Sequence, residues 1–205
     1  CRRGQMLGAQ LHETRLALGL SRLAFPNANS LAEAVFATAH QLLSGVGHSG
    51  VARLTVTRGS GKRGYKPDFD AAPRSILVAQ SDRVIDNPGV RCGRAETHWA
   101  DQPQLSGLKL LARTEQVLAA GEAATAGWDD AIMLDAREQV ISSSRGNIFI
   151  ITAGKVLTPD LARCGIAGTR RQLLIDSILP SLGSEAEVCS LSWDQLMTAD
   201  AVVIT

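Results

Sequence analysis

Lys109 is the residue of this sequence whose surroundings most directly suggest chemistry. It stands between Leu108 and Leu110 in the stretch SGLKLLART. A lysine between leucines usually extends its amine to water while its methylene groups stay on the apolar surface. The alternative is a desolvated amine with a lowered pKa, ready to form a Schiff base with a carbonyl compound. The stretch alone leaves both interpretations open.

A second pattern is CGIAGTRRQLL, in which a glycine-containing turn leads into a predicted helix. The first amides of a helix have no partner within it, and such an N-terminus binds phosphate well. We expect free N–H groups at residues 165–168, among them those of Ile166 and Ala167. An ordinary junction between a turn and a helix is the alternative.

A third pattern is the glycine-rich stretch TRGSGKRGY, which contains Arg58, Lys62, Arg63 and Tyr65. Three cations and a phenol on one flexible loop are either a solvated basic turn or a clamp for a substrate rich in carboxylates.

The stretch QVISSSRGNIFII is unusual because small and polar residues separate two apolar, strand-like segments. An ordinary hairpin needs only two turn residues, often Asn-Gly. The interruption here runs from Ser142 to Asn147, carries three serines and contains no acid. Its length and composition therefore need another explanation.

The composition limits the classes of partner. The chain has 205 residues, is 45% hydrophobic and carries a net charge of +1. This is enough for one large domain or two small ones, and the charge gives no reason to expect nucleic acid or an anionic membrane. No apolar run approaches the roughly 20 residues of a membrane span.

The cysteines indicate a reducing, cytoplasmic setting. They are scattered, form no CxxC pair, and are accompanied by four scattered histidines, which argues against a zinc site. Because the sequence starts without a methionine and stops inside the strand-like run AVVIT, we expect both of its ends to be incomplete.

The elements that must position these residues are of mixed type. Periodicity predicts helices over 11–23, 31–43, 108–121 and 165–179, and strands over 51–57, 75–80, 90–97, 130–134, 139–141, 148–152, 155–157 and 199–205. Ser30 and Glu33 are expected to form a capping box, and Asn87-Pro88-Gly89 a turn. The antiparallel hairpins of the second half favour the α+β class. We expect a domain at 1–80 and another at 81–205.

Together with the HxxRL pattern of His12 and Arg15-Leu16, these motifs resemble the fold-type-IV PLP-dependent enzymes, most closely the aminodeoxychorismate lyases of folate synthesis. The resemblance spans residues 4–205. It is carried by TRGSGKRGY at 57–65, GLK and EQVLA within 107–119, the segment 147–149, and TPDLARCGIAGTRRQ at 158–172. Branched-chain and D-amino-acid aminotransferases share the fold but match the glycine-rich loop less well. The resemblance implies a small N-terminal α/β domain and a larger, β-barrel-like C-terminal domain with helices.

The resemblance also implies a cofactor site. Lys109 would carry the Schiff base to pyridoxal 5'-phosphate (PLP) and move protons, and Arg15 would hold the phosphate with help from the backbone amides of Ile166 and Ala167. The implied cofactor-binding set is Arg15, Lys109, Ser142, Asn147, Ile166 and Ala167.

For the substrate, the resemblance places Arg63 and Tyr65 where related enzymes bind a carboxylate. The implied reaction converts 4-amino-4-deoxychorismate to 4-aminobenzoate and pyruvate, in a cytoplasmic homodimer.

Ser142 departs from the family pattern. The family has a glutamate at this position, whose carboxylate pairs with the protonated pyridine nitrogen of PLP. A serine hydroxyl forms no ion pair, and hydrogen bonds to charged groups are worth roughly 1.5–3 kcal/mol against about 1 for neutral ones. We therefore expect a weaker electron sink. Leu110, Ala112 and Thr114 also replace the usual histidine, asparagine and leucine.

Two kinds of hypothesis remain open. The chain is either an active PLP-dependent lyase, impaired by Ser142, or a degenerate member that binds PLP or a chorismate-like ligand without catalysis. Aminotransferase activity, on branched-chain or D-amino acids, is a third possibility. It is disfavoured because repeated proton transfer at carbon depends more strongly on a protonated pyridine.

Overall fold

The computed structural model describes residues 1–81 and 89–205. The chain divides into two compact units, unit 1 (Cys1–Asp86) and unit 2 (Asn87–Thr205). The sequence-based boundary was expected after residue 80. In the expected Asn87-Pro88-Gly89 turn, Asn87 and Pro88 lie outside the described residues.

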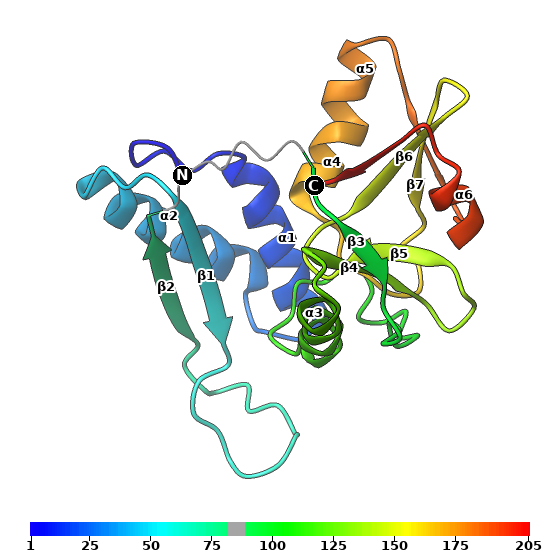
Figure 1. Cartoon of the computed structure of the whole chain (residues 1–205). Helices are drawn as coiled ribbons and strands as arrows, with labels where there is room; N and C mark the ends of the chain where they lie inside the picture. Colours follow the sequence, from blue (N-terminus) through cyan, green and yellow to red (C-terminus); the bar gives the residue numbers. More distant parts are fainter. Residues whose placement is uncertain (82–88) are drawn as a thin grey trace. The chain divides into compact units, whose positions relative to one another are not determined.

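Unit 1 combines a pair of packed helices with a two-stranded antiparallel sheet (Figure 1). Its elements are α1 (Ala9–Arg22), α2 (Ala28–Gly45), β1 (Val51–Thr57) and β2 (Arg74–Gln80). The apolar spacing that predicted both helices places Leu20, Phe36 and Leu43 in the buried core. The helices and strands of unit 1 therefore lie close to their predicted positions.

The start of α2 differs from the prediction. Its N-cap is Asn27, whose backbone is left-handed with φ 52°, and Ser30 lies inside the helix. No side chain caps this end, so the expected capping box of Ser30 and Glu33 is wrong. Asparagine tolerates the left-handed conformation better than most residues, which allows the helix to begin earlier.

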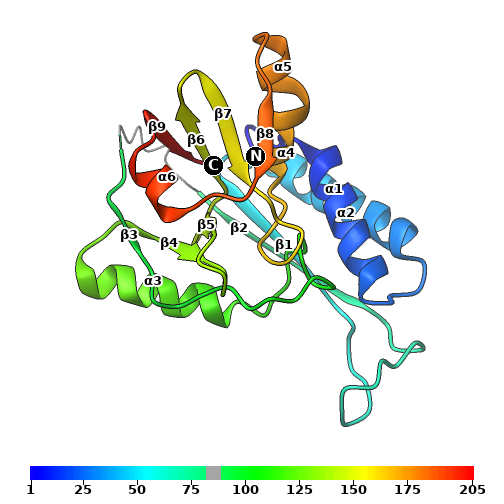
Figure 2. The ribbon, with the colours of Figure 1, turned by 90° about the vertical axis from the view of Figure 1, so that its right-hand side faces the viewer.

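Unit 2 contains two sheets and several helices (Figure 2). Its strands are β3 (Cys92–Arg94), β4 (Asp130–Leu134), β5 (Val140–Ser143), β6 (Ile148–Thr152), β7 (Lys155–Pro159), β8 (Ala186–Cys189) and β9 (Ala201–Ile204). Its helices are α3 (Thr114–Ala126), α4 (Thr169–Leu173), the π-helical turn η1 (Leu174–Ile178), α5 (Leu179–Ser181) and α6 (Trp193–Met197). The sequence analysis did not anticipate β8 and α6, and a single helix was expected over 165–179.

The two sheets have the orders β3-β4-β5 and β8-β7-β6-β9. The pairs β3–β4 and β7–β8 are parallel and the others antiparallel. The α+β class is therefore confirmed. The described strands form no closed barrel, because β5 and β6 belong to different sheets, and only an isolated bridge joins Ser142 of β5 to Asn147, the residue before β6.

Strand β4 separates two apolar cores. Ala131 and Met133 belong to a cluster that includes Trp99, whereas Ile132 and Leu134 belong to a second cluster around Ile148 and Leu191. Successive side chains of a strand point to opposite faces, so both faces of β4 are buried. This explains why its sequence reads as a continuous apolar run.

Candidate active site

Lys109 lies in a non-helical segment that precedes α3. The prediction of a helix from residue 108 is wrong, because α3 begins only at Thr114. The Arg113 side chain donates from Nε to the Leu110 carbonyl at 2.9 Å and from Nη2 to the Leu108 carbonyl at 2.8 Å. These bonds fold the segment back on itself and delay the helix.

The side chain of Lys109 is exposed, whereas Leu108 is buried and Leu110 is half-buried. The flanking leucines therefore do not bury the amine, contrary to the desolvated interpretation of this stretch.

Backbone hydrogen bonds join the Lys109 segment to the turn that precedes α4. The Gly107 N–H donates to the Gly165 carbonyl, and the Ala167 N–H donates to the Gly107 carbonyl, both at 3.0 Å. Gly107 has φ +78°, a conformation that favours glycine. Lys109 therefore leaves the chain two positions beyond a fixed backbone contact with the 165–168 turn.

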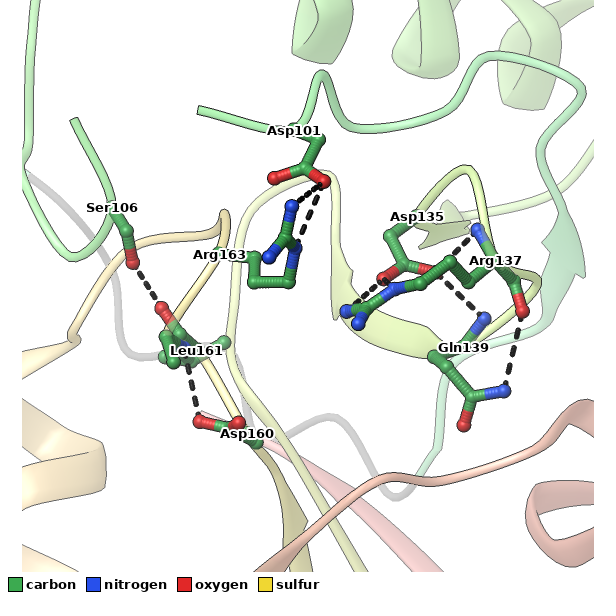
Figure 3. Close-up of polar contacts among 9 residues, drawn as sticks. Asp101, Ser106, Asp135, Arg137, Gln139, Asp160, Leu161 and Arg163 are labelled. Carbon is green, nitrogen blue, oxygen red and sulfur yellow. Dashed lines mark hydrogen bonds and ion pairs between the residues drawn. The ribbon is translucent and has the colours of Figure 1, made fainter. Parts of the chain in front are cut away.

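Further contacts hold the same two loops together. Arg163 forms an ion pair with Asp101, and the Ser106 hydroxyl donates to the Leu161 carbonyl (Figure 3). The Gln102 N–H donates to the Arg163 carbonyl at 3.0 Å. Loops 101–107 and 161–167, which we call the paired loops, are thus connected along their length.

The 165–168 turn offers fewer free amides than the sequence predicted. The amide of Ala167 is donated to Gly107, so the expectation that it points outward is wrong. The structure shows no acceptor among residues 1–81 and 89–205 for the amide of Ile166. Helix α4, which follows, continues without a break through η1 into α5, so its N-terminus at Thr169 is the positive end of a longer helical segment.

Asn147 fixes the orientation of this turn. Its Nδ2 donates to the Ile166 carbonyl at 2.8 Å. A Cβ at Gly168 would overlap Asn147 Oδ1, so only glycine allows this close approach. Asn147 is also the bridge partner of Ser142. The turn, Asn147 and Ser142 therefore belong to one connected network.

Ser142 is buried in β5 opposite Met133. Its Oγ accepts a hydrogen bond from Trp99 Nε1 at 3.0 Å. The sequence analysis did not select Trp99, because nothing in the local sequence links it to a residue 43 positions away.

The other polar residues of the 142–147 segment shape the turn. Ser143 Oγ accepts from the amides of Arg145 and Gly146, at 3.3 and 2.9 Å. Ser144 and Arg145 both bond to the buried carboxylate of Asp130. Burial disfavours that charge, but the bonds from the serines, a backbone amide and Arg145 outweigh it and hold the pKa of Asp130 below its usual value.

In unit 1, Arg15 lies on α1 with a half-buried side chain. Its Nη2 lies 3.3 Å from His12 Nδ1, which accepts the bond if the ring proton is on Nε2. Burial lowers the pKa of the Arg15 guanidinium, which nevertheless stays charged near neutral pH. Arg22, near the end of the same helix, is exposed.

Arg63 and Tyr65 lie on the long loop between β1 and β2, and both are exposed. Arg58, which the sequence grouped with them, has a structural role instead. Its guanidinium donates to the carbonyls of Leu23 and Ala24 and lies 4.2 Å from the centroid of the Phe25 ring. The expected convergence of basic side chains therefore does not include Arg58.

The structure brings together the backbone segments that carry the five predicted site residues of unit 2. These residues are Lys109, Ser142, Asn147, Ile166 and Ala167. The other three, Arg15, Arg63 and Tyr65, belong to unit 1. In the part of the chain that the structure describes, no group of three or more His, Cys, Asp or Glu side chains is arranged to hold a metal ion. None of the helices within residues 1–81 and 89–205 has the length and apolar character needed to cross a membrane.

Comparison with known proteins matches this chain to class IV amino-transferases and to aminodeoxychorismate lyases. The family model for amino-transferase class IV matches residues 1–205. An aminodeoxychorismate lyase of Vibrio harveyi is 30% identical over 208 residues, which cover 98% of this chain and 74% of the relative. A branched-chain-amino-acid aminotransferase-like protein 2 of Arabidopsis thaliana is 28% identical over 211 residues, covering 99% of this chain but 37% of the relative. The crystal structure of 4-amino-4-deoxychorismate lyase from Pseudomonas aeruginosa matches with a TM-score of 0.86 and 37% identity, covering 99% of this chain and 75% of that one.

Proposed function

Because the chain belongs to the amino-transferase class IV family, we propose that it is a PLP-dependent lyase that converts 4-amino-4-deoxychorismate to 4-aminobenzoate and pyruvate. Family membership confirms the broader expectation from the sequence, a PLP-dependent enzyme of fold type IV. The choice of substrate and the role of each residue are the proposal.

The observation that carries the proposal is the extent of the similarity to the two lyases. It covers nearly all of this chain and about three quarters of each lyase. The plant aminotransferase-like protein matches as much of this chain but only 37% of its own length. The lyase reaction is therefore the better-supported assignment.

The residues of unit 2 fit PLP. The cofactor needs an amine to bind its aldehyde, donors for its phosphate and a polar partner for its ring nitrogen. Lys109 offers the amine, and the amide of Ile166 has no acceptor among the described residues. Ser142 provides a buried hydroxyl. The guanidinium of Arg15 would add a charged donor for the phosphate.

When bound, PLP supplies the electron sink for negative charge at the substrate carbon that carries the amino group. Lys109 would hold the cofactor at rest, and its amine would then move protons, accepting one from that carbon and donating one to the enolpyruvyl group as its C–O bond to the ring breaks and it departs as pyruvate. Asn147 fixes the Ile166 carbonyl and so the direction of the neighbouring amides. Arg63 and Tyr65 bind substrate carboxylates.

A second candidate is a protein that binds PLP or a chorismate-like ligand without catalysis. The observation that favours it is the neutral, buried environment of Ser142, which supplies no negative charge for a pyridinium. Aminotransferase activity is disfavoured for the same reason, because that reaction depends more strongly on ring protonation.

The test is release of 4-aminobenzoate from 4-amino-4-deoxychorismate, measured by chromatography with PLP at saturation. We expect measurable release by the wild type and complete loss in Lys109→Ala, with loss of the borohydride-trapped PLP adduct. Lys155→Ala, which removes another lysine of unit 2, is the matched control and should keep both. A PLP adduct without release would favour the non-catalytic candidate, and an adduct on Lys62 or Lys155 would overturn the role of Lys109.

We further propose that the enzyme is a cytoplasmic homodimer, as the resemblance implies. Light scattering coupled to size-exclusion chromatography of the protein at several concentrations would test the dimer. Cell fractionation would test the location.

A further inference from the structure

Ser142 and Trp99 form a buried hydrogen bond whose direction is fixed by chemistry. Trp99 Nε1 lies 3.0 Å from Ser142 Oγ, and the two residues are 7% and 4% exposed. An indole N–H donates and cannot accept. Ser142 is therefore the acceptor in this bond.

The hydroxyl hydrogen of Ser142 remains available. A serine hydroxyl has one hydrogen and two lone pairs, and Trp99 occupies one of the lone pairs. Among residues 1–81 and 89–205, the structure shows no acceptor for the hydrogen. Because buried polar groups are nearly always paired, this hydrogen is suited to donate to a bound molecule.

Trp99 is held so that it cannot easily release Ser142. Its backbone N–H donates to the Leu134 carbonyl at 2.9 Å. The next residue, Ala100, donates its N–H to Glu115 Oε1 at 3.1 Å. The indole packs in the apolar cluster that also contains Met133. The donor is thus fixed by both backbone and ring.

The carboxylates at the two ends of β4 are already engaged. Asp130 is paired with Arg145 at 3.3 Å. Asp135 is paired with Arg137 at 2.7 Å, as Figure 3 shows. Asp135 also accepts from the amides of Arg137 and Gln139. Neither acid is available to form an ion pair with a cationic ligand beside Ser142.

We propose that Trp99 is a positioning residue that presents the Ser142 hydroxyl as a hydrogen-bond donor to the unprotonated ring nitrogen of PLP. The inference rests on the proposed function, because it takes PLP as the ligand of the network that joins Ser142, Asn147 and Ile166. It adds the direction of the bond and the protonation state of the ring. The site thereby selects a ring nitrogen that accepts rather than donates.

The binding test compares PLP with its 1-deaza analogue, in which a C–H group replaces the ring nitrogen. The wild type should prefer PLP, and Ser142→Ala should reduce this preference by about 3- to 10-fold, as expected for one neutral hydrogen bond. Trp99→Phe keeps an aromatic ring but removes the donor, so it should reduce the preference by a smaller factor. Trp128→Phe changes another tryptophan packed on the same cluster and should leave the preference unchanged.

A second measurement needs no variant. The ¹⁵N NMR spectrum of the wild type loaded with ring-labelled PLP should show an unprotonated, hydrogen-bonded pyridine nitrogen at neutral pH. A pyridinium signal, or an unchanged preference in both Ser142→Ala and Trp99→Phe, would overturn the inference and leave the proposed function standing. Failure of the wild type to bind PLP at all would overturn the proposed function together with the inference.

Discussion

The paired loops of unit 2 and the β1–β2 loop of unit 1 both carry predicted site residues, but they are held very differently. The paired loops are connected by bonds between distant residues, including Gly107 to Gly165 and Arg163 to Asp101. In the β1–β2 loop, Arg58 and the Arg74–Ser60 bond of 3.3 Å secure the ends. Arg63 and Tyr65 lie exposed between them.

This difference indicates that the paired loops hold the cofactor and that the β1–β2 loop receives the substrate. A group that holds a cofactor needs a fixed backbone, because small displacements weaken both binding and chemistry. A group that receives a substrate needs room to move. We therefore expect substitutions in the paired-loop network to affect PLP binding, and substitutions in the β1–β2 loop to affect the substrate.

Among substitutions that keep Lys109, the largest effect on PLP binding is expected for Arg15→Ala. Arg15 belongs to unit 1, but unlike Arg63 and Tyr65 it lies on a helix and its side chain is half-buried. We therefore expect it to hold the cofactor, as the residues of the paired loops do. Loss of a charged bond to phosphate should weaken PLP binding by roughly 10- to 100-fold, from about 1.5–3 kcal/mol. Fluorescence titration with PLP would measure it. Arg22→Ala, on the exposed part of the same helix, is the control, and equal losses in both variants would contradict the phosphate role.

Gly168→Ala should have the next largest effect. The added Cβ would overlap Asn147 Oδ1 and separate the Asn147 amide from the Ile166 carbonyl. Loss of this bond should weaken PLP binding about tenfold, because a buried polar group is left unpaired. Gly121→Ala places a methyl group in open space on α3 and should keep the affinity. If both variants bind PLP like the wild type, the turn is not part of the cofactor site.

Arg63→Ala tests whether the β1–β2 loop binds the substrate rather than the cofactor. The KM for 4-amino-4-deoxychorismate should rise about tenfold, as expected for loss of one charged contact, while the Kd for PLP stays near its starting value. Steady-state kinetics and PLP titration of the same preparation separate the two. Lys62→Ala removes a neighbouring cation and should have a smaller effect on KM. A large loss of PLP affinity in Arg63→Ala would place this loop in the cofactor site. It would contradict the proposal that the β1–β2 loop serves only the substrate.

The smallest effect concerns acid stability. Burial disfavours the charge of Asp135, but bonds from the Gln139 amide and from Arg137 outweigh it and lower its pKa. A lowered pKa in the folded state means that the stabilisation is present above the ordinary pKa of about 3.9 and is lost as the pH falls through the folded value. The melting temperature should therefore drop below about pH 4.

Asp135→Asn provides the comparison for this effect. The variant should be less stable than the wild type at neutral pH, and its melting temperature should depend less on pH below about 4. Asp70→Asn, on the exposed β1–β2 loop, should keep the pH dependence of the wild type. Identical acid profiles for wild type and Asp135→Asn would show that this carboxylate does not contribute.

Local sequence patterns predicted the elements whose formation depends on residues close together in the chain. The β-branched run at 148–152 and the alternation at 51–57 match β6 and β1 because both patterns depend on neighbouring residues alone. The spacing around Asn147 also located Ser142 in the segment where β5 ends. Motif spacing therefore selected residues whose backbone segments lie together in unit 2, and their role in a cofactor site stays a prediction.

The errors arise from contacts between distant residues. The late start of α3 depends on Arg113 and on the pairing of Gly107 with residues 165 and 167. The occupied amide of Ala167 has the same cause. Trp99 was missed because only folding brings it next to Ser142. Such contacts override local propensity and leave no trace in a single sequence.

Strand β4 has a consequence for how unit 2 opens in solution. Its side chains contribute alternately to both apolar clusters, through Met133 on one face and Leu134 on the other. Neither cluster can lose its packing without exposing a strand that the other needs. The backbone amides of β4 should therefore exchange with deuterium only through the global opening of unit 2, whereas those of β9, at the edge of its sheet, exchange earlier through local opening.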